Sequence, residues 1–267
     1  MNFTCINGEF VPFQQSTLPV SDLIIQRGYG IFDFFLVRDR VPTYISFHLD
    51  RFIKSASIMG LGLKYTKEEL TEVVLKLIAK NDIQNSSVKI LLTGGASADD
   101  FTLSPEQSTL VIINKPFEVK WPESWKNGAL LLTSNYQREM PEAKTINYIR
   151  SVSLSRKLAE TQAAELLYLD RNWVRECSRS NVYIVKDSII LTPKSKILAG
   201  VTRRRILNTM GFTVVEADFK LRELLNADEV FITSTTKGVL PIVQIDKHVI
   251  SDGKIGLISK AIQQAIM

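Results

Sequence analysis

The sequence has little cysteine and little histidine, and it contains no long apolar run. Its two cysteines are too few for a disulfide framework and are not spaced as a pair of metal ligands. His48 and His248 are the only histidines, so no metal site is visible. No uninterrupted apolar stretch could span a bilayer, and the first residues lack the pattern of a secretory signal. We therefore expect a cytoplasmic protein without a membrane segment.

The charged residues show only a mild excess of one sign. The 267 residues include 33 Lys and Arg against 28 Asp and Glu, which gives a net charge of +5. Such an excess favours an anionic ligand without requiring nucleic acid. The only basic triplet, Arg203-Arg204-Arg205, has no basic stripe or stacking aromatics beside it, so a solvated helix face is the favoured interpretation. We expect small-molecule ligands, and neither nucleic acid nor membrane as a partner.

Strand and helix patterns alternate in the N-terminal part of the chain. Asn7-Gly8 separates two short apolar segments and predicts a hairpin turn. Ser46 is placed to cap a helix over residues 47–59. Thr66 and Glu69 have the spacing of a capping box at the start of the next helix. Further strands are predicted over residues 31–37, 41–45, 88–93 and 109–114.

Residues 116–125 contain two prolines and mixed charge, which predicts a domain boundary. We expect an N-terminal α+β domain over 1–116, an interdomain linker over 117–125 and a C-terminal domain over 126–267. The C-terminal patterns predict helices over 148–164, from Thr202 to Met210, near Leu221 and from Ile255, and strands over 130–134, 165–169, 182–185, 189–191, 213–215 and 230–233. This order indicates an α+β protein without regular βαβ winding.

The stretch from Val174 to Tyr183 has a composition suited to a site rather than a core. It places Glu176, two arginines and a tight turn of small residues between two strand-like segments. Charged groups are rarely buried in a core unless they are paired. Glu176 is therefore the first candidate for a functional carboxylate.

Four other features, each weak alone, suit an anionic cofactor. Gly200-Val201-Thr202 opens a predicted helix whose N–H groups can bind phosphate, although a simple turn and cap is favoured for this fragment alone. Residues 233–238 offer hydroxyls after a strand, or form only a polar turn. Arg51 can fork onto phosphate oxygens or form an ordinary surface ion pair. Lys144 is an amine that a pocket can make reactive, although most lysines are solvated.

In this order along the chain, these segments resemble the fold-type IV pyridoxal-phosphate enzymes, which include D-amino-acid transaminases, branched-chain aminotransferases and aminodeoxychorismate lyases. The resemblance covers nearly the whole chain and is carried by five segments: residues 48–51, 144–148, 175–181, 200–203 and 227–236. It implies a small N-terminal α+β domain and a barrel-like C-terminal α+β domain with pyridoxal 5'-phosphate between them. It also implies a homodimer whose sites use both chains.

The resemblance implies a role for each candidate residue. Lys144 is similar to the lysine that forms a Schiff base with the cofactor and then moves the α-proton as base and acid. Glu176 is similar to the carboxylate that keeps the pyridine nitrogen protonated, so that the ring can accept electrons. Tyr148 resembles a donor near the phenolic oxygen, with packing at the helix start as the alternative. The implied phosphate cup consists of Arg51, Val201, Thr202, Ser234 and Thr235.

The substrate is harder to predict. Residues 94–101 occupy the region where one well-known group of D-amino-acid transaminases carries an arginine and a histidine for the substrate carboxylate, and this sequence has neither there. Arg179 and Arg27 instead resemble the arginines of a less common group of D-amino-acid transaminases. For Arg179 the alternative is a salt bridge to a nearby acid.

The resulting prediction is a pyridoxal-phosphate transaminase that acts on D-amino acids, with 2-oxoglutarate or pyruvate as the acceptor. Three alternatives stay open: a branched-chain L-amino-acid aminotransferase, an aminodeoxychorismate lyase, and a family member that binds the cofactor without turnover. The presence of Lys144 and Glu176 argues against the last of these.

Overall fold

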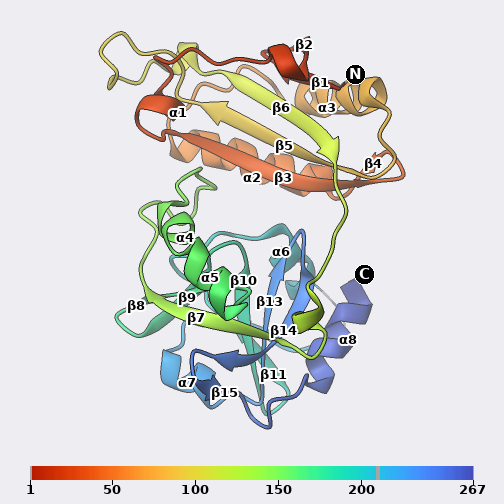
Figure 1. The fold of residues 1–267 in the computed structure, drawn as a ribbon, viewed down its shortest axis with the longest axis vertical. Coiled ribbons are helices and arrows are strands. Elements are labelled where there is room, and N and C mark those ends of the chain that lie inside the picture. The colour runs from red at the N-terminus through yellow and green to blue at the C-terminus, as the bar shows by residue number, and fades with distance from the viewer. Residues whose placement is uncertain (1, 209–210, 267) are drawn as a thin grey trace. The chain divides into compact units, whose positions relative to one another are not determined.

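The computed structural model describes residues 2–208 and 211–266, and it divides the chain into two compact units (Figure 1). Unit 1 comprises Met1–Glu118 and Ala143–Asn147, and unit 2 comprises Val119–Glu142 and Tyr148–Met267. The return of residues 143–147 to unit 1 differs from the domain limits given above, because this segment bridges to a strand of unit 1. Over the described residues, no helix combines the length and the apolar character needed to cross a membrane.

Unit 1 is built on an antiparallel six-stranded sheet with the order β2-β1-β6-β5-β3-β4. Its strands are β1 (Phe3–Ile6), β2 (Glu9–Pro12), β3 (Gly30–Arg38), β4 (Val41–Pro42), β5 (Ser86–Thr93) and β6 (Leu110–Pro116). The predicted hairpin at Asn7-Gly8 is confirmed, and both residues have positive φ. The strand predicted over 41–45 was too long, because Ile45 already begins a helix.

Two long helices, α2 (Ile45–Ile58) and α3 (Lys67–Asn81), contribute to the apolar core of unit 1 together with residues of its sheet. The remaining helices of this unit are short: η1 (Phe13–Gln15), α1 (Leu23–Gln26) and η2 (Pro105–Gln107). The predicted capping box is confirmed, since Thr66 and Glu69 each accept the backbone N–H of the other. The predicted cap by Ser46 was wrong, because Tyr44 adopts a left-handed conformation and precedes the helix.

Unit 2 contains a mixed nine-stranded sheet. Its strands are β7 (Ala129–Asn135), β8 (Glu165–Asp170), β9 (Trp173–Cys177), β10 (Asn181–Lys186), β11 (Ile189–Thr192), β12 (Val214–Glu216), β13 (Glu229–Ser234), β14 (Gly238–Ile245) and β15 (His248–Val249). The order is β12-β11-β10-β13-β14-β7-β8-β9, with β15 beside β14. The end strand β9 also contacts β10, so the sheet is curled. Both units mix helices and strands, which confirms the predicted α+β class.

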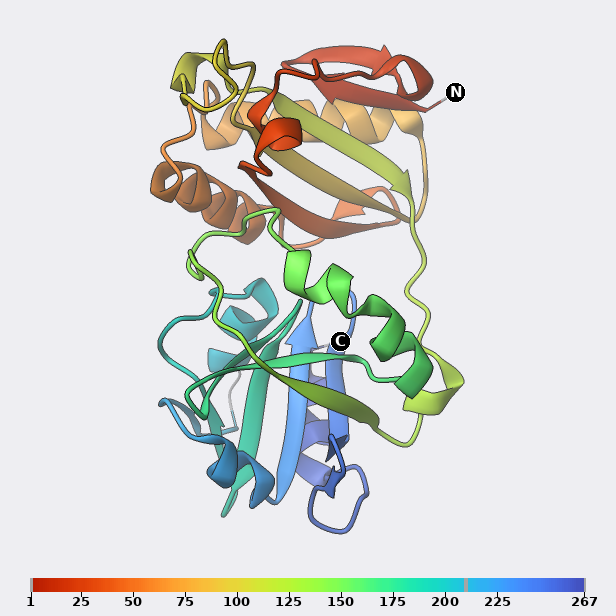
Figure 2. The ribbon, with the colours of Figure 1, turned by 60° about the vertical axis from the view of Figure 1, so that its left-hand side comes forward.

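The helices of unit 2 are short. They are η3 (Glu123–Trp125), α4 (Ile149–Ser153), α5 (Ser155–Thr161), α6 (Val201–Leu207), α7 (Leu221–Leu225) and α8 (Leu257–Ile266). The single helix predicted over 148–164 is divided at Leu154, whose ψ of 9° departs from helical geometry. Figure 2 shows α8 beside the blue strands β13 and β14, with which it is in contact. The helix end predicted at Met210 lies outside the described residues.

Candidate active site

Lys144 of unit 1 lies in a segment that runs beside the free edge of β3. The N–H of Phe32 donates to the carbonyl oxygen of Lys144 at 2.9 Å, and the N–H of Ile146 donates to Gly30 at 3.1 Å. The N–H of Lys144 donates to the hydroxyl of Ser55 at 3.0 Å. Its Nζ lies 4.6 Å from the centre of the Phe32 ring. The backbone of this lysine is therefore fixed, and its amine lies over an aromatic ring.

Arg51 of unit 1 holds the carboxylate of Asp33, which is fully buried. Nε and Nη2 of Arg51 each lie 2.8 Å from a different oxygen of Asp33, and His48 Nδ1 lies 2.7 Å from one of them. Burial alone raises the pKa of Asp33, but Arg51 and His48 outweigh it and hold that pKa well below its usual range. Nη1 of Arg51 makes none of the hydrogen bonds found among the described residues. The N–H groups of Nη1 can therefore donate to a second anion.

Glu176 is the second-last residue of β9 in unit 2. Both of its carboxylate oxygens accept hydrogen bonds. Arg138 donates to Oε1 through Nε and Nη2, each at 2.7 Å. The N–H of Leu198 donates to Oε2 at 2.9 Å. Only 5% of Glu176 is exposed. The orientation of this carboxylate is therefore set by the protein.

The turn after Glu176 is held by a second buried carboxylate, that of Glu165 on β8. Glu165 accepts the N–H of Arg179 at 2.5 Å and the hydroxyl of Ser180 at 2.5 Å. The amine of Lys237, itself buried, lies 2.6 Å from the same carboxylate. Burial raises the pKa of Glu165, but the charges of Lys237 and Arg179 more than offset this and lower it. The turn is thus pinned through its backbone, and Arg179 remains exposed.

The residues of the predicted phosphate cup in unit 2 lie at the start of α6 and at the end of β13. Val201 and Thr202 are the first two residues of α6, which has no side-chain cap and no acid in its first turn. A Cβ at Gly200 would lie 2.1 Å from Oδ1 of Asn181, so only glycine fits there. Ser234 is the last residue of β13, and Thr235 follows it in a turn. The N–H groups and hydroxyls in this region form a donor set suited to a phosphate.

Tyr148 precedes α4 in unit 2. The pKa of its hydroxyl is raised to about 12, mainly by burial; Arg138 and Arg179 lower this pKa, whereas Glu165 and Glu176 raise it. Tyr148 is therefore a neutral hydrogen-bond donor at physiological pH, as the proposed contact with a phenolic oxygen requires.

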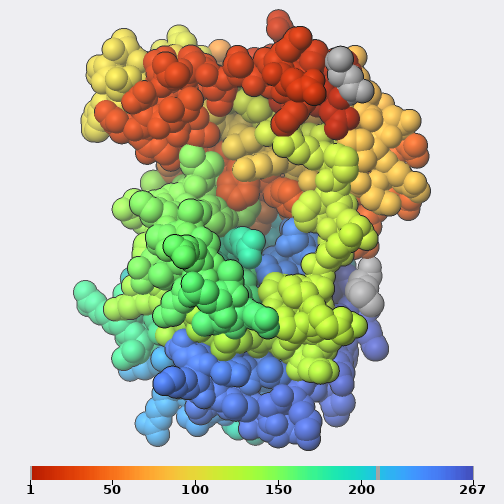
Figure 3. Space-filling view, in the orientation of Figure 1, coloured from red at the N-terminus to blue at the C-terminus, as the bar shows by residue number. Residues whose placement is uncertain are grey.

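Arg27 is exposed at the C-terminal end of α1 in unit 1, where its Nη1 donates to the carbonyl oxygen of Gln26 at 2.8 Å. The loop between β5 and β6, yellow in Figure 3, lies at the surface of unit 1. In this loop Asp99 accepts hydrogen bonds from Ser97 and from the N–H groups of Phe101 and Thr102. The loop is thus ordered by its own polar groups.

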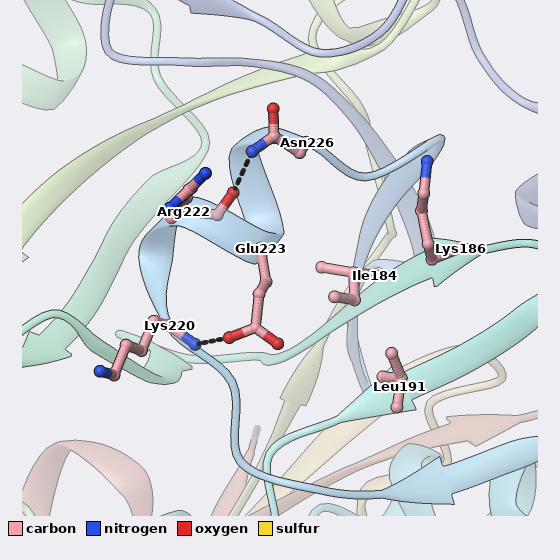
Figure 4. Close-up of a pocket in the computed structure, with 7 residues that line it drawn as sticks. All are labelled: Ile184, Lys186, Leu191, Lys220, Arg222, Glu223 and Asn226. Carbon is pink, nitrogen blue, oxygen red and sulfur yellow. Dashed lines mark hydrogen bonds between the residues drawn. The ribbon is translucent and has the colours of Figure 1, made fainter.

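A pocket of about 480 Å³ opens beside α7 in unit 2 (Figure 4). Its lining consists of Ile184, Lys186, Leu191, Lys220, Arg222, Glu223 and Asn226. Glu223 accepts the N–H of Lys220 at 2.8 Å, and Lys186 pairs with Asp228 at 2.7 Å. None of the predicted site residues lines this pocket, so we do not assign the reaction to it.

The sequence patterns did not identify four residues that organise the candidate site: Asp33, Arg138, Glu165 and Lys237. Asp33 carried a usable signal, because it is a lone acid in the apolar strand β3 and a buried carboxylate requires a partner. Arg138 carried none, since nothing near it in the sequence indicates a contact with Glu176. Together, the donors around Glu176 and α6 fit a cofactor that has a ring nitrogen and a phosphate.

Comparison with known proteins gives three findings. The family model described as amino-transferase class IV matches residues 30–245. A D-alanine aminotransferase of Staphylococcus epidermidis is 31% identical over 266 residues, covering 97% of this chain and 94% of its own, and one of Listeria monocytogenes is 31% identical over 272 residues, covering 97% and 93%. The solved structure of a T.th. branched-chain amino acid aminotransferase with pyridoxamine 5'-phosphate has a TM-score of 0.87 at 25% identity, covering 98% of this chain and 92% of its own.

Proposed function

The chain belongs to the class IV aminotransferases, and from this premise we propose that it transfers the amino group of a D-amino acid to a 2-oxo acid. Its fold is fold type IV, and its cofactor is pyridoxal 5'-phosphate, in keeping with the family. Similarity over almost the full length to D-alanine aminotransferases supports the D configuration of the substrate. The proposed acceptor is 2-oxoglutarate or pyruvate.

The proposal assigns a role toward the cofactor to each predicted site residue. When bound, the cofactor supplies a ring that accepts the electrons left after Cα loses its proton. Glu176 holds the proton on the ring nitrogen, and Arg138 together with the N–H of Leu198 keeps its carboxylate in place. Tyr148 donates to the phenolic oxygen. The phosphate is assigned to Arg51, Val201, Thr202, Ser234 and Thr235.

Lys144 is assigned as the Schiff-base lysine, which moves the proton between Cα and the cofactor. Its backbone is held by Phe32 and Ser55, so the point from which its side chain extends is fixed. A base attached to the protein beside the reacting carbon loses less translational and rotational entropy in the reaction than a base that must first meet the substrate in solution, and this lowers the activation free energy.

The observation that carries the substrate assignment is the exposed side chain of Arg179 on the turn that follows Glu176. Since Glu165 clamps the N–H of Arg179, the guanidinium projects from a rigid support and can fork onto a carboxylate without rearrangement of the backbone. Arg27 is proposed as a second arginine for the same carboxylate.

The test is a panel of half-reactions, in which the enzyme with bound cofactor is mixed with one amine and the change in cofactor absorption is followed. We expect conversion with D-alanine and D-glutamate. Conversion with L-leucine instead would identify a branched-chain aminotransferase, and release of pyruvate from a chorismate-derived amine would identify a lyase. No conversion with any of them would indicate a cofactor-binding protein without turnover.

The proposal also includes assembly as a homodimer and a cytoplasmic location. The low cysteine content suits a reducing compartment. Light scattering of the purified holoenzyme tests the dimer directly, and a monomeric mass with full activity would contradict it.

A further inference from the structure

Lys89 of β5 lies on the same face of the unit 1 sheet as Lys144. In the β3–β5 ladder Lys89 is opposite Phe34, while Phe32 lies opposite Lys144 across the other edge of β3. Side chains two residues apart on a strand point to the same face, so these four residues share one face. The other face carries Asp33 and is covered by α2. Figure 1 shows β3 and β5 side by side.

The amines of Lys89 and Lys144 both lie beside the ring of Phe32. Nζ of Lys89 lies 5.0 Å from the centre of the Phe32 ring, and Nζ of Lys144 lies 4.6 Å from the same centre. Both amines therefore lie beside the Phe32 ring, on the face of the sheet that also carries Phe34. A molecule whose reacting carbon is at Lys144 can therefore reach both the Phe32 ring and the ammonium of Lys89.

Lys89 has no acidic partner among the described residues. Partial burial, followed by the charge of Lys115, lowers its pKa, and no carboxylate acts in the opposite direction. A half-buried ammonium without a counter-ion is unfavourable, and an anion that binds beside it removes that penalty. Its contact with the Phe32 ring supplies only part of the lost hydration.

We propose that Lys89 binds the side-chain carboxylate of a dicarboxylic substrate, so that the preferred pair is an acidic D-amino acid such as D-glutamate and its 2-oxo acid. This inference rests on the proposed function, in which Lys144 acts at Cα and Arg179 takes the α-carboxylate. Phe32 and Phe34 then contact the methylene groups between the two ends of the substrate. The arrangement distinguishes dicarboxylic from small neutral substrates by one charge-assisted hydrogen bond.

The experiment compares kcat/KM of the holoenzyme for D-glutamate and D-alanine in the wild type, Lys89→Gln and Lys89→Arg. Removing one charge-assisted contact is expected to lower kcat/KM for D-glutamate by about 10- to 100-fold in Lys89→Gln, with less than about threefold change for D-alanine. Lys89→Arg, which keeps the charge, is expected to retain most of the D-glutamate activity. Calorimetric binding of glutarate to the holoenzyme gives a readout without turnover, and Lys89→Gln is expected to weaken it similarly.

Lys115→Gln is the matched control, because it removes a neighbouring positive charge from the same face while its own Nζ lies over Phe13, 4.1 Å from the ring centre. This variant keeps the ammonium of Lys89 and is therefore expected to keep the preference for D-glutamate. If Lys89→Gln changes both substrates equally or neither, Lys89 only packs against Phe32 and the inference is overturned, while the proposed function stands. If the wild type converts no D-amino acid at all, the proposed function fails and this inference fails with it.

Discussion

Asp33 in unit 1 and Glu165 in unit 2 are both fully buried carboxylates, but they hold arginines in opposite ways. Asp33 binds the guanidinium of Arg51 through both oxygens. Glu165 binds the backbone N–H of Arg179 and takes its counter-charge from Lys237, so that the guanidinium of Arg179 remains exposed. A pinned guanidinium suits a group that stays bound through the catalytic cycle, whereas an exposed one on a fixed backbone suits a ligand that is exchanged at every turnover.

The largest expected effect concerns Lys144, the residue to which the covalent chemistry is assigned. Lys144→Ala is expected to lower kcat with D-alanine by more than about 10³-fold, because both the covalent partner of the cofactor and the base at Cα are lost. Single-turnover kinetics of the loaded enzyme measure this. Lys144→Arg keeps the positive charge and is expected to be equally inactive. Normal turnover in either variant would show that the chemistry resides elsewhere.

The second test removes the anion of unit 1. Asp33→Asn leaves Arg51, whose side chain is only 10% exposed, without its counter-ion, and we expect the free energy of unfolding to fall by about 3–5 kcal/mol. Urea denaturation measures this. Asp50→Asn on the same helix is the control, because Asp50 pairs with Lys67 at the surface and its loss is expected to cost less than about 1 kcal/mol. Equal destabilisation by the two substitutions would show that the buried pair of Asp33 and Arg51 contributes no more to stability than the surface pair of Asp50 and Lys67.

The lowered pKa of Asp33 predicts that the free energy of unfolding depends on pH. Its pKa is lower in the folded chain than in the unfolded chain, so its contribution to stability is complete above the unfolded value near pH 4 and is lost as the pH falls below it. Glu165, whose pKa is also lowered, has the same sign. Stability of the wild type is therefore expected to fall on acidification, and less steeply in Asp33→Asn.

The third test separates charge from backbone support in unit 2. Glu165→Gln keeps an acceptor for Arg179 but leaves Lys237 as an unpaired buried ammonium, and we expect about 2–4 kcal/mol of destabilisation. Adding Lys237→Met to this variant removes the unpaired charge and is expected to recover at least about 1 kcal/mol of stability. Thermal and urea unfolding of the three variants measure the coupling. If the changes in the free energy of unfolding caused by the two substitutions simply added, the side chains of Glu165 and Lys237 would not stabilise each other.

The fourth test concerns the exposed arginine itself. Arg179→Ala is expected to raise KM for amino and oxo acids by about 10- to 100-fold, which is the loss of a charge-assisted contact, while the absorption of the bound cofactor stays unchanged. Arg156→Ala, at an exposed position of α5, is the control. Unchanged apparent affinities in Arg179→Ala would end its assignment as the carboxylate contact.

Two kinds of feature could be predicted from the sequence: local structures such as helix caps, and site residues that belong to an ordered series of motifs. The capping box of Thr66 and Glu69 spans only three residues, and its hydrogen bonds are present. The cap at Ser46 was wrong because the conformation of Tyr44, not side-chain chemistry, decides where the helix begins. Propensity alone likewise did not predict the break at Leu154.

The contacts that organise the candidate site are separated widely along the chain. Arg138 and Glu176 are 38 residues apart, and Lys237 and Glu165 are 72 residues apart. Each member of these pairs resembles an ordinary surface charge until the sheet of unit 2 brings them together. Glu176 could be assigned a role because it stands in a recognisable order of motifs, whereas its partner Arg138 has no local pattern of its own.

The smallest expected effect belongs to Tyr148, whose hydroxyl is neutral. Tyr148→Phe removes one neutral hydrogen-bond donor and is expected to lower kcat/KM by about fivefold, equivalent to about 1 kcal/mol. Since the pKa of Tyr148 is raised to about 12, its hydroxyl stays protonated up to about pH 10, and the ratio of wild-type to variant activity is expected to be constant from about pH 7 to pH 10. Rates measured across that range test both points. A ratio that changed with pH would mean that Tyr148 exchanges a proton during the reaction, which would move it from the groups that hold the cofactor to those that act with Lys144.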